Sequence, residues 1–145
     1  MKVPKQTLSG KDLLLEAAKL AGAAHSDQVR RGGSAPYITH VARVVERQVS
    51  DRHRVVAWLH DVVEDSPVTI LDLHEMGFPG WVITAVDAIT KRTNEPYKAY
   101  LRRVAADPLA TEVKIADMLD NLSDKPTARQ VSKYAEGLHY LVNEA

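Results

Sequence analysis

The segment between residues 52 and 64 constrains the fold most, because it predicts a helix that is apolar on most of its surface. Asp51 precedes it as a candidate N-cap, and no glycine or proline interrupts it. At about 100° per residue, His60, Asp61, Glu64 and Asp65 fall within one sector of roughly 140°, and apolar side chains fill most of the rest. A helix with so little polar surface has to be surrounded by other elements, so we predict a core helix.

The polar sector of this predicted helix carries one imidazole and three carboxylates, from His60, Asp61, Glu64 and Asp65. No lysine or arginine lies between residues 57 and 65 to pair with these acids, and like charges at i,i+4 repel each other. The ordinary interpretation of such a run is a solvated acidic face. The alternative is a divalent cation in front of the face, because imidazole and carboxylate together suit Mn, Fe, Zn or similar metals.

The composition indicates a single globular domain over residues 1–145, with residues 1–8 as a loose arm. Hydrophobic residues make up 45% of the chain and charged residues 26%. The 19 basic and 19 acidic residues give zero formal net charge, which argues against broad binding to nucleic acid or to a membrane surface. Cysteine is absent, which excludes disulfides and thiolate metal sites. With no apolar signal region at the N-terminus, we expect a cytoplasmic protein.

Helix signals recur along the chain, and no alternating strand pattern competes with them. Ser9 with Asp12 resembles a capping box, Thr69 and Thr127 are candidate N-caps, and Gly77 stands where a helix C-terminus is expected. Proline stands at the start of three predicted helices. We therefore predict an all-α bundle of about eight helices. The predicted helices span 13–25, 38–49, 52–64, 70–76, 79–90, 96–106, 108–123 and 127–143.

Two other segments could bring polar groups to the core helix. The run PYITH places His40 at the start of the second predicted helix. Lys114, Asp117 and Asn121 share one face of a later helix, at i, i+3 and i+7. Each also has an ordinary interpretation, as a surface or capping histidine and as a surface ion pair beside an unrelated asparagine.

These histidines and aspartates occur in the order and approximate spacing of the HD-domain metal-dependent phosphohydrolases. The chain most resembles the hydrolase domain of Rel/SpoT-type alarmone enzymes, and within them the stand-alone small alarmone hydrolases. The resemblance runs from about residue 13 to 140. It is carried by AHSDQVRR and PYITH within 24–40, HDVVED at 60–65 and KIADMLDN at 114–121. The HD dipeptide alone is a weak motif, whereas the three stretches together are specific.

The resemblance implies an HD-domain fold and one divalent metal ion, usually Mn²⁺. It implies that Glu64 and Asp65 orient or deprotonate the attacking water. The implied metal ligands are His40, His60, Asp61 and Asp117.

The resemblance also implies contacts to a nucleotide substrate. Asn121 would hold the substrate near the metal, and Arg31 would contact the nucleobase or a phosphate. One extra residue before Pro36 leaves Arg30 as a competitor for that role. Lys98 and Tyr134 lie where the family has phosphate contacts, although Lys98 also fits a solvated helix position and Tyr134 a core position.

The chain departs from the family in places that do not touch an implied ligand. Val41 replaces the usual proline after the PYxxH histidine, and Gly32-Gly33 replaces a small basic cluster, which leaves guanine specificity open.

The implied reaction is removal of the 3′-pyrophosphate from the alarmones ppGpp and pppGpp of the stringent response, giving GDP or GTP and pyrophosphate. One alternative is hydrolysis of another nucleotide, such as a 5′-monophosphate or NADPH. A second is a regulatory module that binds metal and nucleotide without turnover; the water-activating pair Glu64 and Asp65 argues against it. The expected partner is a small nucleotide, with no nucleic acid and no membrane. The sequence leaves the metal, the true substrate and the oligomeric state open.

Overall fold

The computed structural model describes residues 6–30, 33 and 35–145. Within these ranges the chain forms nine helices and no strand; one isolated antiparallel bridge pairs Val29 with Pro36. The all-α prediction is therefore confirmed. The helices are α1 (Gly10–Ala24), α2 (Tyr37–Glu46), α3 (Asp51–Leu59), α4 (Val62–Asp65), α5 (Ile70–Glu75), α6 (Gly80–Ile89), α7 (Tyr97–Ala105), α8 (Pro108–Leu122) and α9 (Ala128–Glu144).

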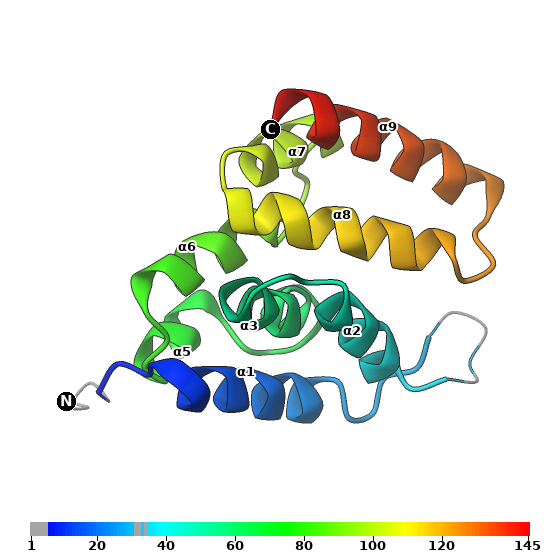
Figure 1. Cartoon of the computed structure of the whole chain (residues 1–145). Coiled ribbons are helices and arrows are strands. Elements are labelled where there is room, and N and C mark those ends of the chain that lie inside the picture. The colour runs from blue at the N-terminus through cyan, green and yellow to red at the C-terminus, as the bar shows by residue number, and fades with distance from the viewer. Residues whose placement is uncertain (1–5, 31–32, 34) are drawn as a thin grey trace.

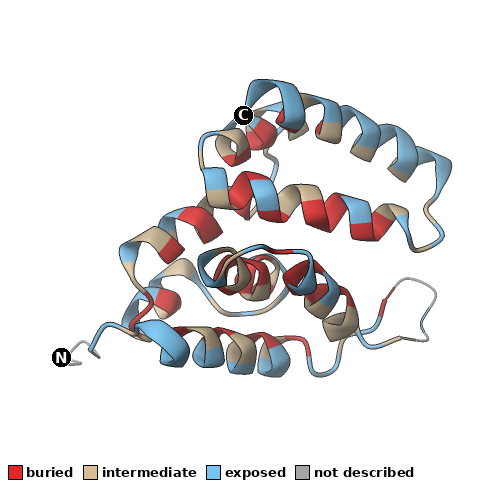
Figure 2. Ribbon diagram, viewed as in Figure 1, coloured by how far each residue is buried: buried red, intermediate tan, exposed pale blue. Residues whose placement is uncertain are grey.

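Helix α3 occupies the centre of the bundle, as predicted. It packs against α1, α2, α6 and α8, and Val55, Val56 and Leu59 are buried. Figure 1 shows α1 along one side of α2 and α3, with α8 on the other side and α9 outermost. Buried positions collect on the sides of α2, α3 and α8 that face one another (Figure 2). Polar groups on these facing sides are therefore enclosed between helices.

The prediction of one helix over 52–64 is wrong. The chain leaves helical geometry at Asp61, whose φ of −110° and ψ of −1° separate α3 from α4. The N-cap of α3 is Ser50 rather than Asp51, because the Ser50 hydroxyl accepts a hydrogen bond from the His53 N–H. The split gives two helices where one is predicted, and it places His60 and Asp61 in a turn between them.

The other helix ends follow local capping chemistry in most places. Thr69 and Thr127 both form capping boxes, and Gly77 follows α5 with a φ of +96°. Ser9 is the N-cap of α1, but its side chain makes no capping hydrogen bond, so the predicted capping box is wrong. Pro108 opens α8 as predicted, whereas the prolines before α6 and α7 stand one position earlier, as N-caps.

Two apolar clusters form the core. One contains buried residues of α2, α3, α6, α7, α8 and α9, and the other contains buried residues of α1, α3, α4, α5 and α6 together with Phe78. Helix α9 lies close to α7 and α8 because Gly137 has no side chain. A Cβ there would lie 2.6 Å from Tyr97 Oη and 3.0 Å from Met118 Sδ. This close approach fixes the position of the α9 residues one turn earlier. Among the described residues, no helix is long and apolar enough to cross a membrane.

Candidate metal centre and its pocket

The structure brings the four predicted metal ligands together. His40 comes from α2, His60 and Asp61 from the turn between α3 and α4, and Asp117 from α8. Each offers one ligand atom, and these atoms all lie within 4.8 Å of one another. His40 Nε2 lies 2.8 Å from Asp117 Oδ1, and His60 Nε2 lies 2.9 Å from Asp61 Oδ2. Both histidines are fully or almost fully buried, so bulk water does not separate the groups.

The other ring nitrogen of each histidine has a partner of its own. His60 Nδ1 lies 2.7 Å from the carbonyl oxygen of Ala57, which can only accept, so Nδ1 carries a proton. His40 Nδ1 lies 2.6 Å from Asp120 Oδ2. In the neutral rings, both Nε2 atoms then face carboxylate oxygens as acceptors, and acceptors at such distances need a shared proton or cation. A single divalent ion would satisfy all four groups, so the donor set fits a metal.

The local charges keep the two aspartates ionised. Burial alone would raise the pKa of Asp117, but the Lys114 ammonium, with Nζ at 2.8 Å, and the close contact with both histidine rings hold it well below its ordinary value. Burial would likewise raise the pKa of Asp61, but His60 lowers it, and the Tyr37 hydroxyl donates to Asp61 Oδ2 at 2.5 Å. Burial and the Asp61 charge raise the pKa of Tyr37, so its phenol stays a hydrogen-bond donor. Two carboxylates therefore remain available as ligands.

Glu64 and Asp65 line a pocket of about 260 Å³ that also includes Asp61 and Asp117. Burial, with the neighbouring charges of Asp61 and Glu64, raises the pKa of Asp65 to about 6. A carboxylate with such a pKa is ionised near neutral pH and accepts a proton more readily than an ordinary aspartate. Glu64 is anchored separately, because its Oε1 accepts a hydrogen bond from the Lys91 N–H at 2.8 Å.

Of the predicted substrate contacts that the structure describes, two line this pocket and one does not. Asn121 and Tyr134 line the pocket, and Asn121 Nδ2 donates to Asp117 Oδ1 at 3.2 Å. Arg30 also lines it, with its guanidinium on Asn121 Oδ1 and on Asp124, whereas Arg31 lies outside the described residues. The structure does not bring Lys98 to this pocket. It is exposed on α7 and lines a different cavity, between α7 and α9.

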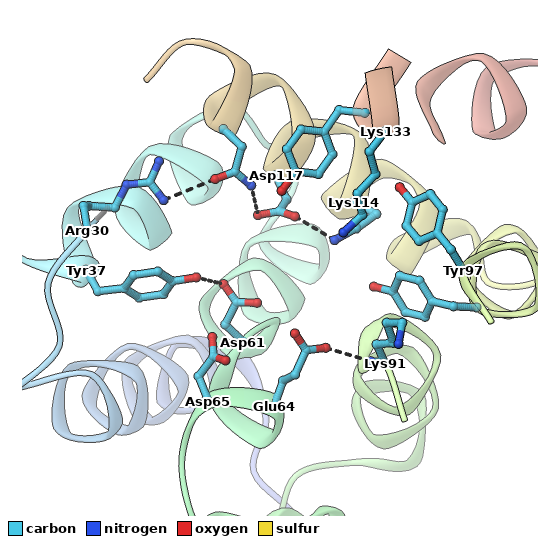
Figure 3. Close-up of a pocket in the computed structure, with 13 residues that line it drawn as sticks. Arg30, Tyr37, Asp61, Glu64, Asp65, Lys91, Tyr97, Lys114, Asp117 and Lys133 are labelled. Atoms are coloured by element: carbon cyan, nitrogen blue, oxygen red, sulfur yellow. Dashed lines mark hydrogen bonds and ion pairs between the residues drawn. The ribbon is translucent and has the colours of Figure 1, made fainter. Parts of the chain in front are cut away.

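Sequence reasoning missed most of the basic half of the pocket. Lys91 from the loop after α6, Lys114 from α8 and Lys133 from α9 all line it, beside Tyr97 and the tyrosines at 100 and 134. Figure 3 shows the acidic residues lying between Arg30 and Tyr37 on one side and these lysines on the other. Burial and the charges of Lys114 and Lys91 lower the pKa of Lys133, so the lysines repel one another.

Of these lysines, Lys114 had a sequence signal, because it shares a helix face with Asp117. Lys91 and Lys133 had none, because only the tertiary packing brings their segments to the pocket. The arrangement as a whole can hold a divalent cation, accept a proton from water and bind a highly charged anion.

No family model matches the chain. It is 32% identical over 154 residues to a probable GTP pyrophosphokinase of Mycobacterium leprae, covering 95% of this chain and 19% of that protein. It is 33% identical over 118 residues to the guanosine-3′,5′-bis(diphosphate) 3′-pyrophosphohydrolase of Haemophilus influenzae, covering 71% and 17%. The chain thus spans about a fifth or less of the length of the first curated relatives it matches.

Two similar proteins are matched over most of their own length. A solved structure of a metazoan orthologue of SpoT that hydrolyses ppGpp superposes with a TM-score of 0.74 at 23% identity, over 95% of this chain and 89% of that one. This likeness shows the fold. The guanosine-3′,5′-bis(diphosphate) 3′-pyrophosphohydrolase MESH1 of Drosophila melanogaster is 30% identical over 121 residues, covering 76% of this chain and 68% of MESH1. Together with the fold and the shared motifs, this match shows that the chain belongs to the family of HD-type small alarmone hydrolases.

Proposed function

We propose that this protein removes the 3′-pyrophosphate from ppGpp and pppGpp, giving GDP or GTP and pyrophosphate. The observation that carries the proposal is one pocket in which two acids and a four-ligand metal centre face three lysines. MESH1 and the Haemophilus relative are both named guanosine-3′,5′-bis(diphosphate) 3′-pyrophosphohydrolases, which supports the same reaction.

The metal of this proposal is one Mn²⁺ ion, held by His40, His60, Asp61 and Asp117. When bound, such an ion lowers the pKa of water toward neutrality and neutralises charge on the phosphoryl group. The Tyr37 hydroxyl and Lys114 hold Asp61 and Asp117 in the positions where they can ligate it. Water and a substrate oxygen would complete the ligand set of the ion beside these four residues.

Asp65 and Glu64 would remove the proton from the attacking water. Asp65 suits this role because its pKa of about 6 leaves it ionised at neutral pH, yet more basic than an ordinary aspartate. Gln28 Nε2 donates to the backbone carbonyl of Asp65 at 2.7 Å, and His25 Nδ1 lies 2.7 Å from Gln28 Oε1. These contacts tie the position of the base to the end of α1.

The basic half of the pocket would bind the pyrophosphate group. Three lysines that repel one another gain stability when an anion enters, and the lowered pKa of Lys133 would return toward its ordinary value. Asn121 and Tyr134 would hold the substrate near the metal, as the family resemblance implies. Arg31 is the proposed contact to the nucleobase or to a phosphate.

A nucleotide panel tests the reaction. Protein with Mn²⁺ is incubated separately with ppGpp, pppGpp, GMP and NADPH, and pyrophosphate and orthophosphate are measured. We expect pyrophosphate from the two alarmones and no orthophosphate. Cleavage of another nucleotide alone would show that the substrate is wrong, and binding of ppGpp without any product would favour a regulatory module.

Variants of the pocket lysines test how the anion binds. We expect Lys91→Ala and Lys133→Ala to raise KM for ppGpp about tenfold or more, because each removes a charge that faces the phosphates. Lys98→Ala is the informative comparison, since this exposed lysine lines a different cavity. A larger effect from Lys98→Ala than from the other two would contradict the proposed orientation of the substrate.

A further inference from the structure

Asp120 contacts the metal centre from behind one of its histidines. It is fully buried on α8, one turn after Asp117. Asp120 Oδ2 lies 2.6 Å from Nδ1 of His40, the ring nitrogen opposite the one that faces Asp117. None of the roles assigned above uses this carboxylate.

Two arginines surround the Asp120 carboxylate. Arg43 on α2 donates from Nε to Asp120 Oδ1 at 2.7 Å and from Nη2 to Oδ2 at 3.2 Å. Arg30 Nη2 lies 4.0 Å from Asp120 Oδ2. A carboxylate held by cations in this way is ionised, and an ionised carboxylate can only accept hydrogen bonds. The hydrogen in the short contact with His40 therefore belongs to Nδ1 of the ring.

This contact decides which nitrogen of His40 is available for a metal. Neutral imidazole carries its proton on either nitrogen, and only the ring protonated at Nδ1 offers the Nε2 lone pair to the ion. His60 achieves the same state through the backbone carbonyl of Ala57. His40 depends on a side chain instead, so a substitution can remove its partner while that of His60 stays in place.

We propose that Asp120 is a positioning residue of the metal centre, which fixes the tautomer and the ring orientation of His40, while Arg43 fixes the Asp120 carboxylate. This inference rests on the metal centre of the proposed function, but it does not depend on the identity of the substrate. It also gives the last aspartate of the KIADMLDN stretch a role distinct from that of the ligand Asp117.

The test measures metal binding without substrate. Titration calorimetry with Mn²⁺ alone compares the wild type with Asp120→Ala and Asp120→Asn. Loss of such an outer partner of a metal-bound histidine lowers metal affinity about 10- to 100-fold, which we expect for Asp120→Ala. Asp120→Asn should fall between this variant and the wild type, because its amide oxygen can still accept from Nδ1.

A second readout reports on the ring itself. In ¹⁵N spectra of histidine-labelled, metal-free protein, we expect His40 in Asp120→Ala to lose its uniform Nδ1–H signature while His60 retains its own. Asp107→Ala is the matched control, because the Asp107 side chain caps the same helix by accepting from the Ala110 N–H. This control should lower the melting temperature without changing either the Mn²⁺ affinity or the His40 signature.

The outcomes separate this inference from the proposed function. A folded Asp120→Ala variant with wild-type Mn²⁺ affinity and an unchanged His40 tautomer overturns the inference alone. Equal losses of affinity in Asp107→Ala and Asp120→Ala also overturn it, because they would show a general effect of helix stability. A wild-type protein that binds no divalent ion overturns both proposals. If Asp120→Ala does not fold, Asp120→Asn, which keeps the side-chain volume, is judged by the same two measurements.

Discussion

Replacing the proposed base Asp65 by asparagine should stabilise the protein while it removes activity. The pKa of Asp65 rises from 3.8 to about 6 on folding, because of burial and the charges of Asp61 and Glu64. The folded state therefore prefers the protonated carboxyl. The favourable contribution of that form is complete below the unfolded pKa, and it is lost as the pH rises through about 6.

The size of the effect follows from this rise. At about 1.4 kcal/mol for each pH unit, ionising Asp65 in the folded protein costs roughly 3 kcal/mol. The side chain is enclosed on one side only and keeps contact with solvent, which screens the charge, so we expect about 1 kcal/mol. Asp65→Asn should then raise the free energy of unfolding by about 1 kcal/mol at pH 8, with little change at pH 4.

Urea unfolding of metal-free protein at pH 4 and pH 8 measures this difference. Asp27→Asn, which neutralises an exposed acid outside the pocket, is the matched control and should show no such pH dependence. Turnover of ppGpp with Mn²⁺ should fall about 10²-fold or more in Asp65→Asn, the usual scale for loss of a general base. Equal stabilisation at both pH values, or destabilisation at pH 8, would refute the electrostatic reasoning.

Three further outcomes follow from single contacts. Arg103 donates from Nε and Nη2 to the two carboxylate oxygens of Glu95 and lowers the pKa of Glu95 to about 2. This stabilisation is present above pH 4.5 and is lost as the pH falls through about 2, so Arg103→Ala should cost about 1 kcal/mol in urea unfolding at pH 7 and less at pH 3. Gly137→Ala should lower the free energy of unfolding by about 1–3 kcal/mol, and the melting temperature with it, although alanine normally favours a helix interior. A rise in the melting temperature would contradict the packing of α9. Asp61→Ala should lose bound metal by elemental analysis while its far-UV circular dichroism stays helical.

The fold was largely predictable because its signals are local. The capping threonines at 69 and 127 and the glycine after α5 act through neighbouring residues, so the sequence indicates them directly. The break at Asp61 was not predictable in this way. No residue between 52 and 64 disfavours a helix strongly, and the turn forms where His60 and Asp61 face groups from α2 and α8. Tertiary contacts there outweigh local propensity, which is worth less than 1 kcal/mol per ordinary residue.

The candidate site likewise contains some residues that the sequence indicates and others that only the tertiary packing brings to it. Its four implied ligands are recognisable because their residue types and order resemble those of a known family, and the structure brings them together. Lys91 and Lys133 could not be found, because their positions depend on the packing of α9 at Gly137 and on the loop after α6. Arg103 holds that loop by donating to the backbone carbonyls of Asp87 and Thr90.

Lys98 shows that a sequence resemblance can point to the residue next to the one that lines the site. Tyr97 lines the pocket, but the next residue along α7 is turned by about 100° and lines another cavity. A loose alignment therefore cannot decide which side chain of a helix reaches the site.

The most direct test of the proposed function is the product released from ppGpp. Wild-type protein with Mn²⁺ should release pyrophosphate and GDP, without orthophosphate, and the Glu64→Gln, Asp65→Asn double variant should still bind metal and ppGpp but turn over at least about 10²-fold more slowly. Failure of the wild type to release pyrophosphate with Mn²⁺ or any other divalent metal, or undiminished turnover in the double variant, would contradict the proposed hydrolysis.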